Sequence, residues 1–136
     1  MKTILLLIDE GNLQGALCRL LERHGFQILE AGDAEDALCL FHGNQGQIDL
    51  VIADVCLPVG SGAQVALTLR TYLPELAVVL AAGYPSEKWK ARDYALLGRL
   101  GSNSLAILRK PLSPQTLLAE IAKLIGGGRI GVARTA

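Results

Sequence analysis

The sequence is poor in aromatic residues and has no excess of either charge. Only 4% of its 136 residues are aromatic whereas 51% are hydrophobic, so a folded core must consist mainly of aliphatic side chains. Thirteen basic and thirteen acidic residues give a formal net charge of zero. Because there is no basic tract, the composition argues against a nucleic-acid-binding surface and against binding to anionic membranes.

Long apolar runs and paired cysteines are also missing. No run approaches the ~20 residues that span a bilayer, and the apolar N-terminal stretch meets acidic residues without a signal-peptide cleavage site. We therefore expect a cytoplasmic protein. The three cysteines, Cys18, Cys39 and Cys56, are widely spaced in apolar surroundings. We expect them to be small core residues rather than disulfide partners or metal ligands.

Short apolar segments alternate with helical patterns along the chain. The segments expected to form strands cover residues 2–8, 26–30, 49–53, 76–81 and 104–108. Between and after them, apolar residues recur at the three- and four-residue spacing of amphipathic helices. Five such alternations predict a single α/β domain, in which a parallel sheet has helices on both faces.

Capping residues predict where several helices begin. Asp33 is an expected N-cap, and Ser61 with Gln64 fits a capping box. Ser113 is an expected N-cap as well, with Pro114 following it at the first helical position.

The last two helices and the C-terminal tail are predicted from less regular patterns. A helix is expected over residues 85–97, and the final helix is expected to stop at the glycines of residues 126–128. We therefore divide the chain into one domain at residues 1–125 and a glycine-rich flexible tail or linker at residues 126–136.

Charged residues come directly after three of the expected strands. Asp9 and Glu10 follow the first strand. Asp54 follows the third, and Lys110 follows the fifth. In a parallel sheet of order 2-1-3-4-5, the first and third strands are neighbours at the topological switch point, so the three carboxylates would crowd together. Repulsion between them favours a divalent cation, and an all-oxygen site suits Mg²⁺.

These charges have the arrangement that a phosphoryl-transfer site needs. The fifth strand lies about 10 Å from the third, a gap that a lysine side chain can largely cover. Lys110 and a metal would then neutralise the oxygens of a phosphoryl group while Asp54 attacks in line to give an acyl phosphate. Taken singly, Asp54 could cap a turn, Asp9 and Glu10 could form an acidic helix N-terminus, and Lys110 could be a surface cation. Their shared position at strand ends favours the functional interpretation.

From residue 2 to about residue 125, the chain resembles the receiver domains of two-component response regulators. The resemblance rests on residues after the first, third and fifth expected strands and in one loop: Asp9, Glu10, Asp54, Pro58, Gly62, Lys110 and Pro111. The segments at residues 82–84 and 109–114 are similar to those of receivers attached to hybrid sensor kinases. The resemblance implies a flavodoxin-like (βα)5 fold, with a doubly wound parallel sheet of strand order 2-1-3-4-5.

The resemblance also implies a role for each site residue. Asp54 would accept a phosphoryl group from the phosphohistidine of a histidine kinase or a histidine phosphotransfer protein. Lys110 would contact that group, and the peptide bond from Lys110 to Pro111 would be cis. Mg²⁺ would be bound by Asp9, Glu10, Asp54 and the backbone carbonyl of Cys56. Such a domain is a signalling module that at most catalyses its own phosphorylation and dephosphorylation, and it can form homodimers.

Two positions depart from the family pattern. Ala82 stands where receivers usually have Thr or Ser at the end of the fourth strand, and Ile107 replaces the usual Tyr or Phe three residues before the lysine. These departures motivate an alternative function, a pseudo-receiver that docks or dimerises without using phosphate. A flavin-binding flavodoxin relative would have the same sheet order. It is disfavoured because the first loop is acidic where a phosphate cradle would need Ser, Thr and Gly.

Overall fold

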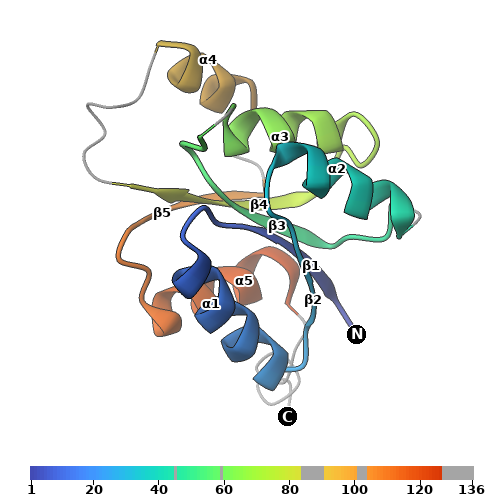
Figure 1. Ribbon diagram of the computed structural model, residues 1–136, viewed down its shortest axis with the longest axis vertical. Coiled ribbons are helices and arrows are strands. Elements are labelled where there is room, and N and C mark those ends of the chain that lie inside the picture. Colours follow the sequence, from blue (N-terminus) through green and yellow to red (C-terminus); the bar gives the residue numbers. More distant parts are fainter. Residues whose placement is uncertain (45, 59, 84–90, 101–103, 127–136) are drawn as a thin grey trace.

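A five-stranded parallel sheet runs through the centre of the molecule in the order β2-β1-β3-β4-β5 (Figure 1). The computed structural model describes all residues except 45, 59, 84–90, 101–103 and 127–136. The strand order confirms the predicted doubly wound fold. The strands are β1 (Thr3–Leu7), β2 (Gln27–Glu30), β3 (Leu50–Asp54), β4 (Ala77–Ala82) and β5 (Leu105–Arg109).

Helices cover both faces of the sheet, as right-handed crossovers between parallel strands require. In Figure 1, α1 and α5 lie below the sheet, and α2, α3 and α4 lie above it. No helix in the described residues is long and apolar enough to cross a bilayer. The helices are α1 (Gly11–Arg23), α2 (Ala34–Gly43), α3 (Gly62–Arg70), α4 (Ala91–Leu100) and α5 (Pro114–Ile125).

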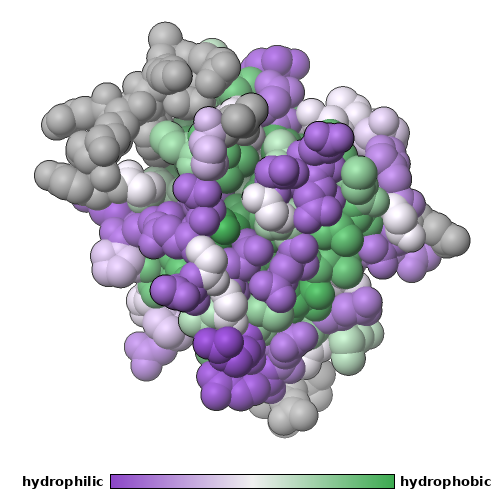
Figure 2. Space-filling model, in the orientation of Figure 1, coloured by the Kyte–Doolittle hydropathy of each residue, from purple (hydrophilic) through white to green (hydrophobic). Residues whose placement is uncertain are grey.

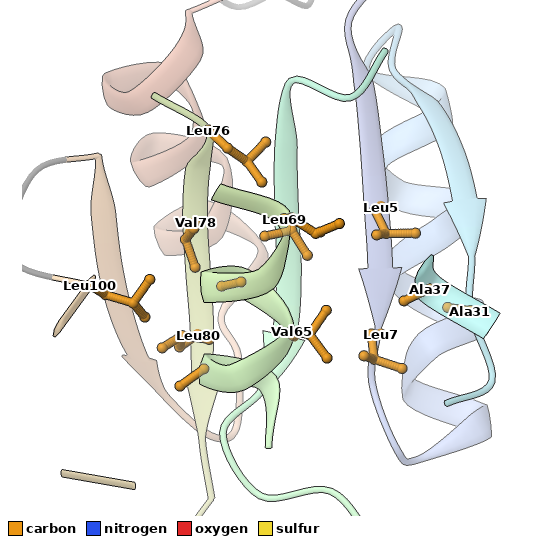
Figure 3. Close-up of a cluster of buried hydrophobic side chains, with 14 of the residues drawn as sticks. Leu5, Leu7, Ala31, Ala37, Val65, Leu69, Leu76, Val78, Leu80 and Leu100 are labelled. Carbon is orange, nitrogen blue, oxygen red and sulfur yellow. The ribbon is translucent and has the colours of Figure 1, made fainter. Parts of the chain in front are cut away.

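Alternate residues of each buried strand contribute to two separate aliphatic cores, because successive strand side chains point to opposite faces. Leu5 and Leu7 of β1 pack with α2, α3 and α4, whereas Ile4 and Leu6 pack with α1 and α5. Figure 3 shows the first core, in which Val65 of α3 lies among side chains of the neighbouring strands. On the face shown in Figure 2, hydrophilic residues are interspersed with hydrophobic areas.

The predicted N-caps are present. Asp33 accepts a hydrogen bond from the amide of Asp36 at 2.7 Å. Ser61 accepts from two amides at the start of α3. The capping box is only half formed, because the Gln64 side chain donates to Thr68 instead of returning to Ser61. At α5 the N-cap hydroxyl is bonded as predicted and a proline opens the helix.

Element ends differ from the predictions by a few residues. β3 extends to Asp54 and β4 to Ala82, so both are the last residues of their strands rather than the first residues of loops. Helix α4 continues to Leu100, past the predicted end at residue 97. The predicted helix start at residues 85–90 and the tail at residues 127–136 lie outside the described residues.

The prediction that all three cysteines are core residues was wrong for two of them. Only Cys18 is buried, and none of the three forms a disulfide. Cys39 is exposed because it lies two residues from both buried Ala37 and buried Phe41, which turns it about 200° away from the core-facing side of α2. Cys56 is exposed because it follows β3 in the loop at the sheet edge.

Candidate functional site

Asp54 is the last residue of the central strand β3, and it is almost fully buried, with 2% of its surface exposed. The chain after it turns back sharply, since the amide of Gly62 donates to the carbonyl of Val55 at 3.1 Å. A Cβ atom at Gly62 would overlap the Asp54 carbonyl oxygen and lie 2.9 Å from the Cβ of Ala53. Only glycine at this position lets the start of α3 approach the end of β3 so closely.

The two carboxylate oxygens of Asp54 have different partners. Oδ2 accepts a hydrogen bond from the backbone amide of Asp9 at 2.7 Å. Oδ1 lies 2.7 Å from Nζ of Lys110, an ion-pair distance. Oδ1 is also buried and accepts no hydrogen bond of good geometry from the described residues. The site thus holds a buried carboxylate that is charge-compensated on one oxygen and hydrogen-bonded on the other.

Lys110 is shared between two acids. Its Nζ also lies 2.7 Å from Oε1 of Glu10, so the ammonium joins the loop after β1 to the end of β3. The lysine side chain is 18% exposed and that of Glu10 is 62% exposed. Burial lowers the pKa of Lys110, but the contacts with Asp54 and Glu10 outweigh it and hold that pKa above its ordinary value. Lys110 therefore remains a cation throughout the neutral range.

The main chain fixes where Lys110 enters the site. Its amide donates to the carbonyl of Ala82 at 3.0 Å, directly after the pairing of Arg109 with Ala82. The peptide bond from Lys110 to Pro111 is cis, as the resemblance implies. From this position after the fifth strand, the Lys110 side chain reaches Asp54 at the end of the third strand, 2.7 Å from its Oδ1.

The two residues that depart from the family pattern, Ala82 and Ile107, lie on strands β4 and β5. Ala82 ends β4 between β3, which ends in Asp54, and β5, which directly precedes Lys110. Its methyl group offers no hydrogen bond. Ile107 pairs with Leu80 in the sheet and is 46% exposed, so an apolar side chain faces solvent on β5.

The acidic residues predicted to bind metal are brought to the same edge of the sheet. Glu10 and Asp54 meet on the Lys110 ammonium, and Asp9 contacts Asp54 through its backbone amide. Within the described part of the chain, no three His, Cys, Asp or Glu side chains are placed together to hold a metal ion. The buried, hydrogen-bond-free Oδ1 of Asp54 and the all-oxygen donor set fit a hard cation such as Mg²⁺. The ligand set of Asp9, Glu10, Asp54 and the Cys56 carbonyl stays a prediction.

Gln14 was not identified from the sequence, although its side chain reaches the end of β1. Its Oε1 accepts a hydrogen bond from the amide of Ile8 at 2.6 Å, and its Nε2 donates to the carbonyl of Ala31 at 3.0 Å. The available signal was weak: a polar residue beside the apolar stripe of α1, one turn after the acidic pair.

Comparison with known proteins agrees with this geometry. The sequence model of the response regulator receiver domain matches residues 4–122. Among curated proteins, the chain is 26% identical over 123 residues to the sensor kinase CckA of Brucella abortus, covering 90% of this chain but 12% of CckA. It is 30% identical over 122 residues to the phosphate regulon transcriptional regulatory protein PhoB of Escherichia coli, covering 88% of this chain and half of PhoB. The chain thus spans half or less of these relatives.

Solved structures give the same result. A receiver domain protein from Clostridium thermocellum is 29% identical with a TM-score of 0.77, covering 92% of this chain and 94% of that one. The receiver domain of the hybrid histidine kinase CckA is 28% identical with a TM-score of 0.71, and the match covers 90% of this chain and 98% of that one. TrrA from Thermotoga maritima, solved in complex with Mg²⁺ and BeF, is 28% identical with a TM-score of 0.72, and the match covers 91% of this chain and 99% of TrrA.

Proposed function

This chain belongs to the response regulator receiver domain family, and on that premise we propose that it accepts a phosphoryl group on Asp54. The observation that carries the proposal is the state of the Asp54 carboxylate. It is buried at the end of the central strand, it lies 2.7 Å from an ammonium, and its Oδ1 accepts no hydrogen bond from the described residues. At the end of the central strand, such a carboxylate is placed to receive a group whose negative charge the neighbouring ammonium can balance.

In the proposed reaction, a carboxylate oxygen of Asp54 attacks the phosphorus of a phosphohistidine. The new bond joins oxygen to phosphorus, the bond between phosphorus and the imidazole nitrogen breaks, and that nitrogen keeps the electron pair. Lys110 balances the negative charge of the transferred group, because its ammonium already lies against Asp54. The Asp9 amide holds Oδ2 and so limits rotation of the carboxylate.

The same proposal includes a Mg²⁺ site formed by Asp9, Glu10, Asp54 and the backbone carbonyl of Cys56. When bound, the cation would neutralise phosphoryl oxygens. The similar protein TrrA was solved in complex with Mg²⁺ and BeF, and this similarity supports the proposed site. Glu10 is paired with Lys110 in this chain, so the Glu10 carboxylate would have to turn away from the ammonium to serve as a ligand.

The proposed phosphodonor is a histidine kinase or a histidine phosphotransfer protein, encountered in the cytoplasm. Similarity to the receiver of the hybrid histidine kinase CckA supports a partner of this class. On this proposal the domain is a signalling module and not an enzyme acting on other substrates. Homodimers are a further proposal, for which the exposed Ile107 on β5 offers an apolar contact.

A second function, a pseudo-receiver that works without phosphate, is favoured by Ala82 and Ile107. The usual hydroxyl at the end of β4 is absent, so one hydrogen bond that would report phosphorylation cannot form. The retained Asp54 and Lys110 favour the first function, because a docking module has no need of a buried ion pair at its sheet edge.

The test is intact-protein mass spectrometry after incubation with acetyl phosphate and Mg²⁺. We expect one phosphoryl group to be added to the native protein and none to Asp54→Asn. The modified peptide should contain Asp54. A folded native protein that gains no phosphoryl group from acetyl phosphate or from a phosphorylated histidine kinase would favour the pseudo-receiver.

A further inference from the structure

The side chain of Gln14 joins three segments near the proposed phosphoacceptor. It projects from α1, accepts from the amide of Ile8 at the end of β1, and donates to the carbonyl of Ala31 after β2. Ile8 and Ala31 are both buried. The carbonyl and amino groups of the Gln14 amide are therefore matched to one buried donor and one buried acceptor, an arrangement that fixes its orientation.

The Ile8 amide held by Gln14 is followed directly by the amide that contacts Asp54. The two consecutive N–H groups have different acceptors. The Ile8 amide donates to Oε1 of Gln14 at 2.6 Å, and the Asp9 amide donates to Oδ2 of Asp54 at 2.7 Å. Helix α1 adds a further restraint, because the amide of Gln14 itself donates to the carbonyl of Glu10 at 2.8 Å. Gln14 therefore contacts the backbone at Ile8, directly before Asp9, and at Glu10, directly after it.

We propose that Gln14 is a positioning residue that sets the Asp9 amide against Asp54 and so orients the carboxylate for phosphorylation. The inference rests on the proposed phosphoacceptor function. Without the Gln14 amide, the buried Ile8 N–H and Ala31 carbonyl lose their partners, and the end of β1 must shift to find others. A shift there moves the Asp9 amide, and the orientation of the carboxylate follows it.

The discriminating variant is Gln14→Met, which has a similar length but can neither donate nor accept strongly. We expect the phosphorylation rate at saturating acetyl phosphate and Mg²⁺ to fall about tenfold, the usual scale for a group that orients a reacting residue. The acetyl phosphate concentration at half-maximal rate should change little, because Gln14 does not touch the donor site.

Two control variants separate positioning from general destabilisation. Gln64→Met makes the same chemical change on the exposed side of α3 and should keep the native rate. Arg70→Met removes hydrogen bonds to the carbonyls of Leu76 and Leu100 near the opposite edge of the sheet. It should lower stability and keep the native rate.

The structural readout is the amide proton resonance of Asp9 in the NMR spectrum, without phosphodonor. A short bond to a carboxylate shifts this proton downfield, and Gln14→Met should move it upfield while Gln64→Met and Arg70→Met leave it in place. The inference is overturned if Gln14→Met keeps either the native rate or the native Asp9 resonance. Failure of the native protein to be phosphorylated would instead overturn the proposed function on which the inference rests.

Discussion

Replacing Lys110 with methionine tests the electrostatic core of the site. The substitution keeps most of the aliphatic stem and removes the ammonium, which lies 2.7 Å from both Asp54 Oδ1 and Glu10 Oε1. The Asp54 side chain is 3% exposed, so its charge stays buried in the variant, where the Asp9 amide still donates to Oδ2 at 2.7 Å. Glu10 is 62% exposed and can turn to solvent.

The expected cost follows from these exposures. Removing one partner of a buried ion pair costs about 3–5 kcal/mol of unfolding free energy. Lys110 is 18% exposed, and water can replace part of its charge stabilisation at the sheet edge, so we expect about 2–3 kcal/mol for Lys110→Met. The lost contact with Glu10 adds about 0–1 kcal/mol, as for other exposed pairs. Adding Asp54→Asn removes the uncompensated charge and should restore at least about 1.5 kcal/mol.

The unfolding free energies of the native protein, the two single variants and the double variant are measured by urea unfolding at pH 7 without Mg²⁺, followed by circular dichroism. Lys123→Met is the matched control, because its partner Glu120 is 3.2 Å away and the lysine is 72% exposed. It should change the unfolding free energy by no more than about 0.5 kcal/mol. The reasoning is refuted if Lys110→Met is as stable as the native protein, or if Asp54→Asn restores nothing in its presence.

Three other measurements test separate features of the structure. Gly62→Ala should lower the unfolding free energy by about 3 kcal/mol or more and reduce Asp54 phosphorylation, because the new Cβ overlaps the Asp54 carbonyl oxygen. Gly43→Ala, which has no atom within 4 Å of its Cβ, should be neutral or slightly stabilising in the same urea assay. The Lys110 pKa is raised, so the stabilisation from its ammonium is complete below the ordinary pKa of 10.5 and is lost as pH rises through the higher folded value. The stability difference between the native protein and Lys110→Met should therefore shrink above pH 10.5, and a constant difference there would contradict this. Burial, with smaller contributions from nearby acids, raises the pKa of Cys18 to about 11. At pH 8 a thiol reagent should label exposed Cys39 and leave Cys18 unlabelled until urea is added, as read by mass spectrometry.

The sheet order and the approach of Lys110 to Asp54 were predictable because they depend on strong, redundant signals. Five apolar segments alternate with helical patterns, and handedness rules leave few topologies for such a chain. Once the strands are ordered, an acid at the end of β3 and a lysine after β5 must face the same edge of the sheet. An error of one or two residues at a strand end does not change which edge a residue faces. The prediction therefore holds although Asp54 is the last residue of β3 and not the first residue of the loop.

The role of Gln14 could not be predicted, because it depends on orientation rather than on pattern. Its partners Ile8 and Ala31 contribute backbone groups, and a backbone amide or carbonyl looks the same in every sequence. The pairing of Glu10 with Lys110 is similar: a glutamate and a lysine a hundred residues apart could meet or remain solvated. Cys39 is different, since its position two residues from Ala37 and Phe41 already predicts an outward side chain.

The arrangement around Ala82 separates acceptance of a phosphoryl group from the response to it. A bound group can shift a conformational equilibrium only by interacting differently with the two states. The Ala82 side chain offers no hydrogen bond, and its carbonyl already accepts from the Lys110 amide. Under the proposed function, the polar contacts that must change lie at Lys110: its 2.7 Å contact with Asp54 has to lengthen when a phosphoryl group is attached, and Glu10 has to turn from the ammonium to a metal. Lys110 stands between β5 and α5, so among the described residues we expect a response to start at that corner rather than at the end of β4.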